Sequence, residues 1–288
     1  MSKSKPLSAK QENQVKSPSQ DTPSRIGLWI IFLSIVLGSM GFMTWLRIPP
    51  LTAPQLTYEV LNTFAHDETA FTQGLLIDNG QMYESTGRIN QSSVRAVDLA
   101  TGRPVTQVDL KKTYFGEGIT IYGSKLYQLT FQNGKILVYD KDSLQLLEEK
   151  DFPYEGWGLT SDPDHLILSD GSATIRFLDP ETFAVKSKIT VRDGRRTVSE
   201  INELEYYDGR IYANVWHEDL ILEIIPASGR ISAKIDMAGL LNPKPDDREA
   251  CLNGIAVDKK TNSFYVTGKL WPKLFEVKFV RKTPESKR

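Results

Sequence analysis

A single carboxylate stands among amide and tryptophan side chains at equivalent places in a repeated phrase of this chain. The phrase recurs five times, and the residue that opens it changes each time. The opening residues are Gln73, Glu117, Trp157, Asn202 and Asn253. A carboxylate that is buried among apolar groups can accept and return a proton near neutral pH, and amides beside it can donate hydrogen bonds. This set of residue types is typical of a site for acid/base chemistry, provided that the fold brings the five positions together.

The spacing of the phrases predicts such a fold. The residues that follow the openers are Gly74, Gly118, Gly158, Glu203 and Gly254, spaced 44, 40, 45 and 51 residues apart. A period of about 40 to 50 residues with strand-forming content is typical of a β-propeller with one four-stranded blade per repeat. Equivalent positions of successive blades converge on a central channel. The sequence therefore predicts an all-β fold, a five-bladed β-propeller, with the five openers in a ring.

The ends of the repeat region indicate how the ring closes. The last repeat has strand signals up to residue 279 but lacks a fourth strand. Residues 57–64 (TYEVLNTF) read as a strand that precedes the first blade and belongs to no other. We expect this strand to complete the last blade and remove exposed sheet edges. The catalytic domain is then residues 57–280, followed by a charged tail at 281–288.

The N-terminal part predicts a membrane anchor. Residues 26–46 carry no charge over 21 positions, about 31 Å of helix, which matches a hydrocarbon core of roughly 30 Å. Residues 1–25 are polar, with a charge balance of +3, so we expect a disordered cytoplasmic tail and export of the remainder. No convincing cleavage site follows the apolar run. We expect an uncleaved single-pass signal anchor, a proline-containing linker at 47–56, and a domain on the periplasmic or extracellular side.

Composition excludes several other functions. The net charge of −1 gives no basic face for nucleic acid, and the single cysteine excludes an intramolecular disulfide. There is no nucleophile elbow or phosphate-binding loop. His66, His165 and His217 lack metal-ligand spacing, and we interpret them as surface or turn residues. Two further carboxylates near the phrases, Glu84 and Glu203, are interpreted as supporting hydrogen-bond acceptors.

Several motifs resemble the plant and bacterial type of glutaminyl-peptide cyclotransferase. The resemblance runs in order from about residue 58 to residue 279, and its last block is the most specific. The motifs are FTQGL (71–75), ESTG (84–87), FGEG (115–118), GWGL (156–159), NELEY (202–206), ANVW (213–216) and TGKLWPKLFE (267–276).

The resemblance implies a five-bladed propeller that cyclises N-terminal glutamine to pyroglutamate with release of ammonia. Its substrates would be peptide or protein N-termini bearing glutamine, with no metal or other cofactor, and we expect a monomeric catalytic domain. The family's acid/base carboxylate falls on Glu117. Its substrate-contacting positions fall on Phe71, Gln73, Phe115, Trp157, Asn202, Trp216 and Lys269. Phe131 stands where the family usually has a tryptophan, so the aromatic wall is kept without an indole N–H.

The reaction needs what these residues offer. The nucleophile is the substrate's own amine, so the enzyme must fold the substrate into a reactive shape and move one proton. Glu117 can move the proton if aromatic walls raise its pKa. Asn202 and Lys269 can donate hydrogen bonds to the developing oxyanion. Asn253 is included in the substrate-binding set by its place in the ring.

Two other functions are open at this point. Glu117, Asn202 and Asn253 around one axis could hold calcium through oxygen, as in a lactonase-like propeller hydrolase, although one carboxylate makes a weak site and Lys269 would oppose the ion. A propeller can also be a non-catalytic binding scaffold. Turnover of a glutamine dipeptide in the presence of a chelator separates these alternatives.

Overall fold

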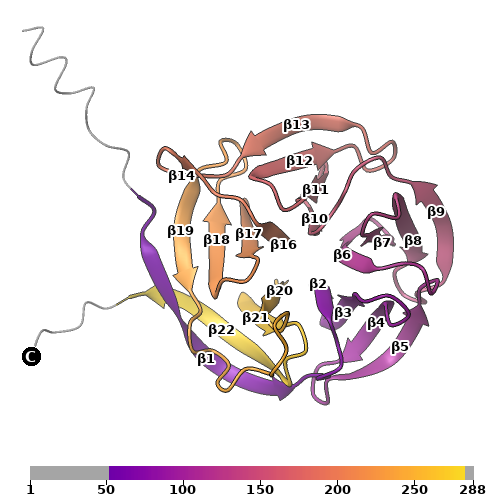
Figure 1. The fold of residues 1–288 in the computed structure, drawn as a ribbon, viewed down its shortest axis with the longest axis horizontal. Coiled ribbons are helices and arrows are strands. Elements are labelled where there is room, and N and C mark those ends of the chain that lie inside the picture. Colours follow the sequence, from indigo (N-terminus) through magenta and orange to yellow (C-terminus); the bar gives the residue numbers. More distant parts are fainter. Residues whose placement is uncertain (1–51, 283–288) are drawn as a thin grey trace, which may run out of the picture. The chain divides into compact units, whose positions relative to one another are not determined.

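The computed structural model describes residues 52–282, and these residues form 22 strands and no α-helix. Most strands belong to antiparallel four-stranded sheets, which Figure 1 shows arranged in a ring around a common centre. The all-β prediction is confirmed, and the arrangement is consistent with a β-propeller. No helix within this range is long and apolar enough to cross a membrane. The predicted anchor at 26–46, the tail at 1–25 and the last residues, 283–288, lie outside the described part.

In each of the first three sheets the strands follow one another in chain order, from the centre of the ring to its rim. Sheet 1 consists of β2 (Thr72–Asp78), β3 (Gln81–Thr86), β4 (Ser93–Asp98) and β5 (Arg103–Asp109). Sheet 2 consists of β6 (Gly116–Tyr122), β7 (Lys125–Thr130), β8 (Lys135–Asp140) and β9 (Leu146–Asp151). Sheet 3 consists of β10 (Leu159–Ser161), β11 (Leu166–Leu168), β12 (Thr174–Leu178) and β13 (Val185–Thr190).

The remaining strands form one eight-stranded sheet that divides into two halves. Sheet 4 is the half made of β16 (Ile201–Tyr207), β17 (Arg210–Val215), β18 (Leu220–Ile224) and β19 (Ile231–Asp236). Sheet 5 is the half made of β20 (Leu252–Asp258), β21 (Ser263–Gly268), β22 (Lys273–Arg281) and β1 (Gln55–Ala65). Only two parallel residue pairs between β1 and β19 join the halves. A short hairpin, β14 (Arg192–Asp193) and β15 (Arg196–Thr197), was not predicted.

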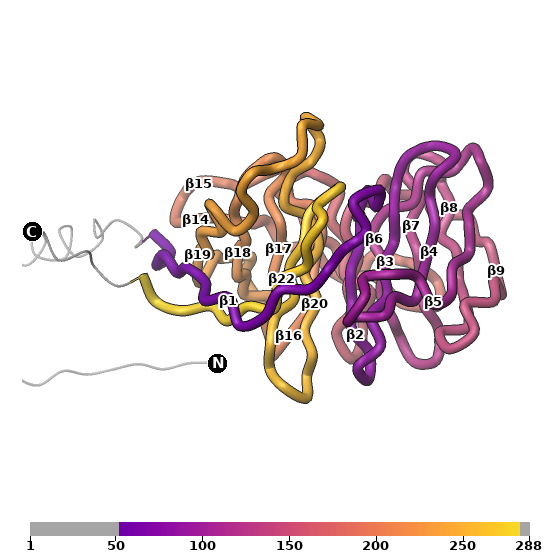
Figure 2. Tube along the Cα trace, turned by 90° about the horizontal axis from the view of Figure 1, so that it is seen from below, coloured from indigo at the N-terminus to yellow at the C-terminus, as the bar shows by residue number. Residues whose placement is uncertain are grey.

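The closing strand pairs as the sequence predicts. β1 runs antiparallel to β22 from the pair Leu56–Arg281 to the pair Ala65–Lys273. Figures 1 and 2 show the two strands side by side at the outer edge, one from each end of the described chain. β1 begins two residues before the predicted strand and ends one residue after it. The pairing covers the outer edge of β22, which would otherwise be open.

Apolar clusters fill the five spaces between neighbouring sheets. Ile119 and Leu126 pack between sheets 1 and 2, and Ile255 and Ile221 pack between sheets 5 and 4. The space between sheets 5 and 1 holds Leu75, Met82, Val97, Ala256, Tyr265 and Leu274. Because each strand points alternate side chains to opposite faces, a sheet can pack against both of its neighbours. Burial between sheets therefore stabilises the ring without any helical layer.

Aspartates at the ends of the third strands stabilise the outer turns by accepting hydrogen bonds. Asp98 Oδ1 accepts hydrogen bonds from the backbone N–H and the hydroxyl of Thr101, at 2.8 and 2.6 Å. Asp179 does the same for Thr182, at 2.9 Å in both cases. These side chains replace the ladder hydrogen bonds that the chain loses where it reverses.

The repeated phrase has a glycine after its opening residue because the innermost strands of neighbouring sheets approach closely there. A Cβ on Gly118 would lie 2.4 Å from the backbone nitrogen of Leu159, and one on Gly158 would lie 2.1 Å from the backbone oxygen of Asn202. Side-chain hydroxyls add further links, since Ser85 Oγ donates to the carbonyl of Glu117 at 2.5 Å and Ser169 Oγ donates to that of Asn202 at 2.6 Å. The backbones that carry the site residues are therefore fixed by the neighbouring sheets.

Candidate active site

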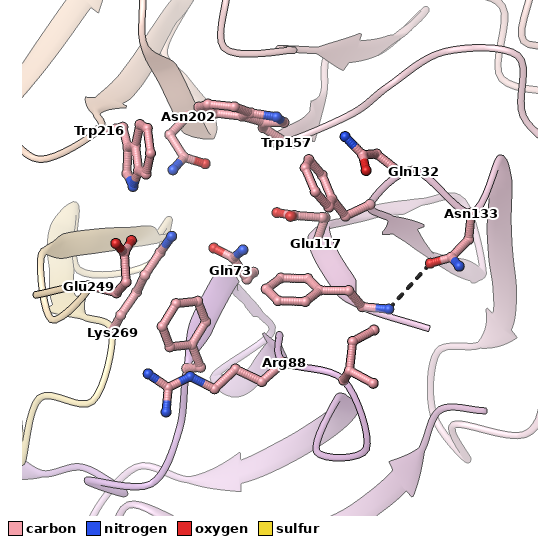
Figure 3. Close-up of a pocket in the computed structure, with 14 residues that line it drawn as sticks. Gln73, Arg88, Glu117, Gln132, Asn133, Trp157, Asn202, Trp216, Glu249 and Lys269 are labelled. Carbon is pink, nitrogen blue, oxygen red and sulfur yellow. Dashed lines mark hydrogen bonds between the residues drawn. The ribbon is translucent and has the colours of Figure 1, made fainter. Parts of the chain in front are cut away.

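A cavity of about 650 Å³ opens at one end of the innermost strands. It brings together nine of the ten residues predicted for the site. The three proposed catalytic residues Glu117, Asn202 and Lys269 line it. So do the substrate-binding candidates Phe71, Gln73, Phe115, Phe131, Trp157 and Trp216. Figure 3 shows Glu117, Gln73, Asn202 and Lys269 with their polar ends turned toward the same space.

Most of the lining residues come from two equivalent places in the sheets. One is the start of the innermost strand, which supplies Gln73 in β2, Glu117 in β6 and Asn202 in β16. The other is the turn after the second strand, which supplies Phe131, Trp216 and Lys269. In all five sheets the next residue in this turn has a positive φ: Arg88 (79°), Gln132 (52°), Gly171 (76°), His217 (61°) and Leu270 (62°). This shared left-handed turn fixes the residue before it, and therefore aims Phe131, Trp216 and Lys269 in a common way.

Asn253 is the predicted site residue that does not line the cavity. Its side chain is fully buried, and its amide nitrogen donates to the carbonyl of Thr72 at 2.9 Å and to Gln73 Oε1 at 3.4 Å. These bonds hold Asn253 beneath the cavity, so direct contact with a substrate is not its role in this geometry. The contact with Gln73 Oε1 leaves the Gln73 NH₂ group for the cavity. Asn253 therefore positions another site residue.

Glu117 is buried in the cavity, with only 4% of its surface exposed. Burial raises the pKa of this carboxyl group well above 4.5, and the charge of Glu155 raises it further. The ammonium of Lys269 and the amide of Gln73 oppose this shift. A carboxyl group with a raised pKa is a stronger base than an ordinary glutamate, which suits an acid/base residue.

Hydrogen-bond donors face Glu117 across the cavity. Lys269 is 4% exposed, and its Nζ lies 4.9 Å from the centre of the Phe71 ring. Its backbone N–H is fixed by the carbonyl of Cys251 at 2.9 Å. Asn202 is also buried, and its Oδ1 atom has no hydrogen-bond partner among the described residues. A buried amide oxygen without a partner is costly, and a bound ligand with an N–H group would remove that cost.

Aromatic rings form the walls. Trp157 and Trp216 pack edge to face with their centroids 5.5 Å apart, and Phe115 contacts Phe71 and Phe131 at 6.1 and 5.9 Å. Burial among aromatic rings is the main reason for the raised pKa of Glu117. The walls also give the cavity an apolar surface that excludes water from a bound substrate.

Five lining residues were not predicted: Arg88, Ile89, Gln132, Asn133 and Glu249. Four of them belong to the left-handed turns that follow the second strands, directly after Gly87 in sheet 1 and after Phe131 in sheet 2. The repeat therefore contained a signal for them, because the turn after each second strand points to the channel. Glu249 lies in the long segment between β19 and β20, which has no equivalent in the other repeats.

The other buried carboxylates have structural partners. Glu84 Oε2 accepts two hydrogen bonds from Arg95 at 3.0 and 2.8 Å, and Glu84 Oε1 contacts Thr72 and His66. Burial by itself would raise the pKa of Glu84, but His66 and Arg95 lower it to about 2. Glu203 accepts the backbone N–H groups of Leu75 and Ile255, at 3.3 and 2.9 Å. Both carboxylates are supporting acceptors, as predicted.

The interpretation of His66 as a surface or turn residue is wrong. The side chain is 8% exposed and lies between the backbone oxygen of Trp271 at 2.6 Å and Glu84 at 3.1 Å. His165 pairs instead with Asp162 at 3.0 Å and is partly buried. Within residues 52–282, one group has metal-ligand spacing, Asp162, Asp164 and His165. None of these three residues lines the cavity.

Comparisons with known proteins point to one family. Residues 34–279 match the model of a family described as glutamine cyclotransferase. The chain is 40% identical over 234 residues to glutaminyl-peptide cyclotransferase of Arabidopsis thaliana, which covers 79% of this chain and 73% of the plant protein. The crystal structure of Myxococcus xanthus glutaminyl cyclase superposes with a TM-score of 0.76 at 35% identity, over 80% of this chain and 100% of the bacterial one.

Proposed function

This chain belongs to the glutamine cyclotransferase family, and we propose that its cavity converts the N-terminal glutamine of peptides and proteins to pyroglutamate with release of ammonia. Its activity is that of a glutaminyl-peptide cyclotransferase. One observation of the geometry supports this assignment most directly. Among the described residues that line the cavity, Glu117 alone is a buried carboxyl group; its pKa is raised, and it faces an ammonium group and two amides between aromatic walls.

The reaction requires one carboxylate to act twice. The α-amine nitrogen of the substrate attacks the carbon of its own side-chain amide, and a new N–C bond closes the five-membered ring. Glu117, ionised at this stage, takes a proton from the attacking amine. The protonated Glu117 then gives this proton to the side-chain nitrogen, whose C–N bond breaks, and ammonia leaves. A raised pKa suits both steps because the group must lose and regain the proton in one cycle.

The negative charge that develops on the amide oxygen needs donors that are already in place. The ammonium of Lys269 is one donor, and the NH₂ group of Asn202 is the other. The unpartnered Oδ1 atom of Asn202 can accept an N–H of the substrate at the same time. Donors held by a folded scaffold do not have to reorganise during the reaction, which is the usual basis of such stabilisation.

The cavity walls supply the second requirement, which is a folded substrate. The glutamine side chain must curl back so that its amide carbon meets the α-amine. Trp157, Trp216, Phe71 and Phe115 line the space, and contact with these rings favours a compact substrate over an extended one. Because the nucleophile and the amide belong to one molecule, holding the reactive shape supplies much of the rate enhancement.

An assay of ammonia release tests the proposal. The full chain is incubated with a glutamine-initiated dipeptide, and both ammonia and the pyroglutamyl product are measured, with and without a chelator. We expect one ammonia per product, no effect of the chelator, and loss of turnover in Glu117→Gln. Loss of activity with the chelator would favour the calcium-dependent alternative, and absence of any turnover would favour a binding scaffold.

We also propose that the sheets count as five propeller blades, and that residues 26–46 anchor this domain to a membrane with the catalytic part exported. The first proposal is supported by the five equivalent turns, and the second by the uncharged 21-residue run and its positive flank. Deletion of residues 1–47 should move the protein from the membrane fraction to the soluble fraction without loss of turnover. Membrane association that persists in the shortened chain would contradict the anchor.

A further inference from the structure

Two residues at the mouth of the cavity have no role in the reaction described above. Arg88 and Ile89 lie in the turn between β3 and β4, and both line the cavity. Arg88 has φ of 79°, a left-handed conformation that costs energy for a residue other than glycine. The side chain that this turn places at the mouth is long and charged, although a glycine would fit the backbone better.

The guanidinium of Arg88 is held in a fixed position. One amino group, Nη2, donates to Asp247 Oδ2 at 2.7 Å, and the carbon Cζ lies 4.4 Å from the centre of the Phe71 ring. Asp247 belongs to the segment between β19 and β20, so the pair links the turn of sheet 1 to the segment that connects sheets 4 and 5. Both side chains are 35% exposed. The bond to Asp247 occupies one of the five N–H donors, and the others have no partner within residues 52–282.

Ile89 is half exposed, at 50%, although most large apolar side chains of the domain are buried. It stands beside Arg88 on the same rim. When the N-terminal glutamine of a substrate occupies the cavity, the second residue of the substrate must extend out through this mouth. The rim therefore offers that residue an apolar side chain and, next to it, fixed N–H donors with a positive charge.

We propose that Arg88 and Ile89 form the subsite for the second residue of the substrate, a conclusion that rests on the proposed function. The guanidinium binds the carbonyl oxygen of that residue, or its carboxylate when the substrate is a dipeptide, and Ile89 packs against its side chain. The site therefore favours an apolar second residue. A free carboxylate on this residue strengthens binding because the hydrogen bond becomes charge-assisted on both sides.

Three substrates and the full-length protein test the subsite. The substrates are glutaminyl-phenylalanine, its C-terminal amide and glutaminyl-glycine, and the measurement is kcat/KM from ammonia release at low salt. Wild type should prefer the free acid to the amide by about fivefold, the scale of a partly exposed charge pair. Arg88→Gln should bring this ratio close to one. Arg103→Gln, which removes the same charge from the outermost strand β5, should leave the ratio unchanged.

Ile89→Ser tests the apolar part. It should lower the preference for glutaminyl-phenylalanine over glutaminyl-glycine by about fivefold, and it should leave the acid-to-amide ratio in place. Ratios between substrates are insensitive to partial unfolding, because a folding defect lowers all three rates equally. The subsite is disproved if wild type shows no acid preference, or if each variant lowers all three rates by the same factor. Absence of ammonia release from all three substrates with wild type would instead disprove the proposed function.

Discussion

Glu84 and Glu117 are both buried glutamates near the centre of the ring, and their pKa values are shifted in opposite directions. Their exposed fractions are 1% and 4%. Glu84 is surrounded by Arg95, His66 and Thr72, which lower its pKa to about 2 although burial would raise it. Glu117 has only the ammonium of Lys269 and the amide of Gln73 opposing the effect of burial, and burial raises its pKa well above 4.5. Burial alone therefore does not decide the protonation of a carboxyl group.

The difference distinguishes these two groups, but a raised pKa alone does not mark a chemical role, since burial also raises the pKa of the supporting carboxyl group Glu203. What sets Glu117 apart is a raised pKa at a place that lines the cavity. An ion pair with several hydrogen bonds fixes Glu84 in one charge state, which suits a residue that holds strands together. The same arrangement would prevent proton transfer. Glu117 is destabilised as an anion, and this makes it a stronger base, able to take a proton from the amine and hold it until the departing nitrogen accepts it. We expect exchange of each carboxyl group for an amide to have opposite consequences, which the following variants test.

The largest effect should come from Glu117→Gln, which should lower turnover of glutamine peptides by at least about a hundredfold. The change is nearly isosteric and removes a buried group that is poorly stabilised when ionised, so the melting temperature should stay the same or rise. Ammonia release and thermal unfolding of the same preparation check both parts. If turnover survives, the assignment of the central carboxylate would be wrong.

Glu84→Gln should act on stability instead. It leaves Arg95 buried with Asp67 as its remaining partner, and breaking a buried ion pair costs about 3 to 5 kcal/mol. For a domain of this size we expect a decrease in melting temperature of roughly 6 to 15 °C. Turnover per folded molecule should remain within about threefold of wild type at low temperature, far from the loss expected for an acid/base residue. Glu68→Gln, a change of an exposed glutamate nearby, is the matched control and should leave both values unchanged.

The pH dependence of kcat should report the surroundings of Glu117. Because the ionised form is the base, the acid limb should lie above pH 4.5, where an ordinary glutamate would place it. Lys269 lowers the pKa of Glu117, so Lys269→Met should move this limb to higher pH as well as lower kcat. Glu155 raises the pKa of Glu117, so Glu155→Gln should move the limb to lower pH. If the acid limb of kcat lies at the same pH in wild type and both variants, a group other than Glu117 controls it.

Much of this arrangement could be predicted from the repeats, and the exceptions have a common cause. The spacing of the repeated phrase predicted the place of Glu117, Asn202 and their neighbours because equivalent positions in a ring of sheets face the same central space. It could not show that Asn253, in the same register, turns its amide to Thr72 and Gln73, since that depends on side-chain packing between sheets 5 and 1. Asp247 and Glu249 lie in a segment that no other repeat contains. His66 was misinterpreted because its partner Trp271 is 205 residues away.

His66 allows the smallest and most specific test of the comparison. Both of its ring nitrogens face acceptors, the backbone oxygen of Trp271 and the carboxylate of Glu84, so both must carry a proton. Burial would lower the pKa of His66, but Glu84 raises it above 6.5 overall. Because the folded-state pKa is the higher one, this histidine contributes stability that is fully present below pH 6.5 and is lost as the pH rises through the folded-state value.

We therefore expect His66→Gln to reduce the free energy of unfolding by about 1.5 to 3 kcal/mol near pH 6, the scale of a lost hydrogen bond to a charged group, and by less at higher pH. Denaturant unfolding of both proteins from pH 5 to pH 9 measures this difference. His165→Gln, which changes a partly exposed histidine paired with Asp162, is the control and should show a much smaller difference. Turnover of glutamine peptides should not change, because His66 contacts Glu84 and not the cavity. A stability difference that is constant with pH would show that His66 is neutral in the folded protein, and Glu84 would then owe its low pKa to Arg95 and Thr72.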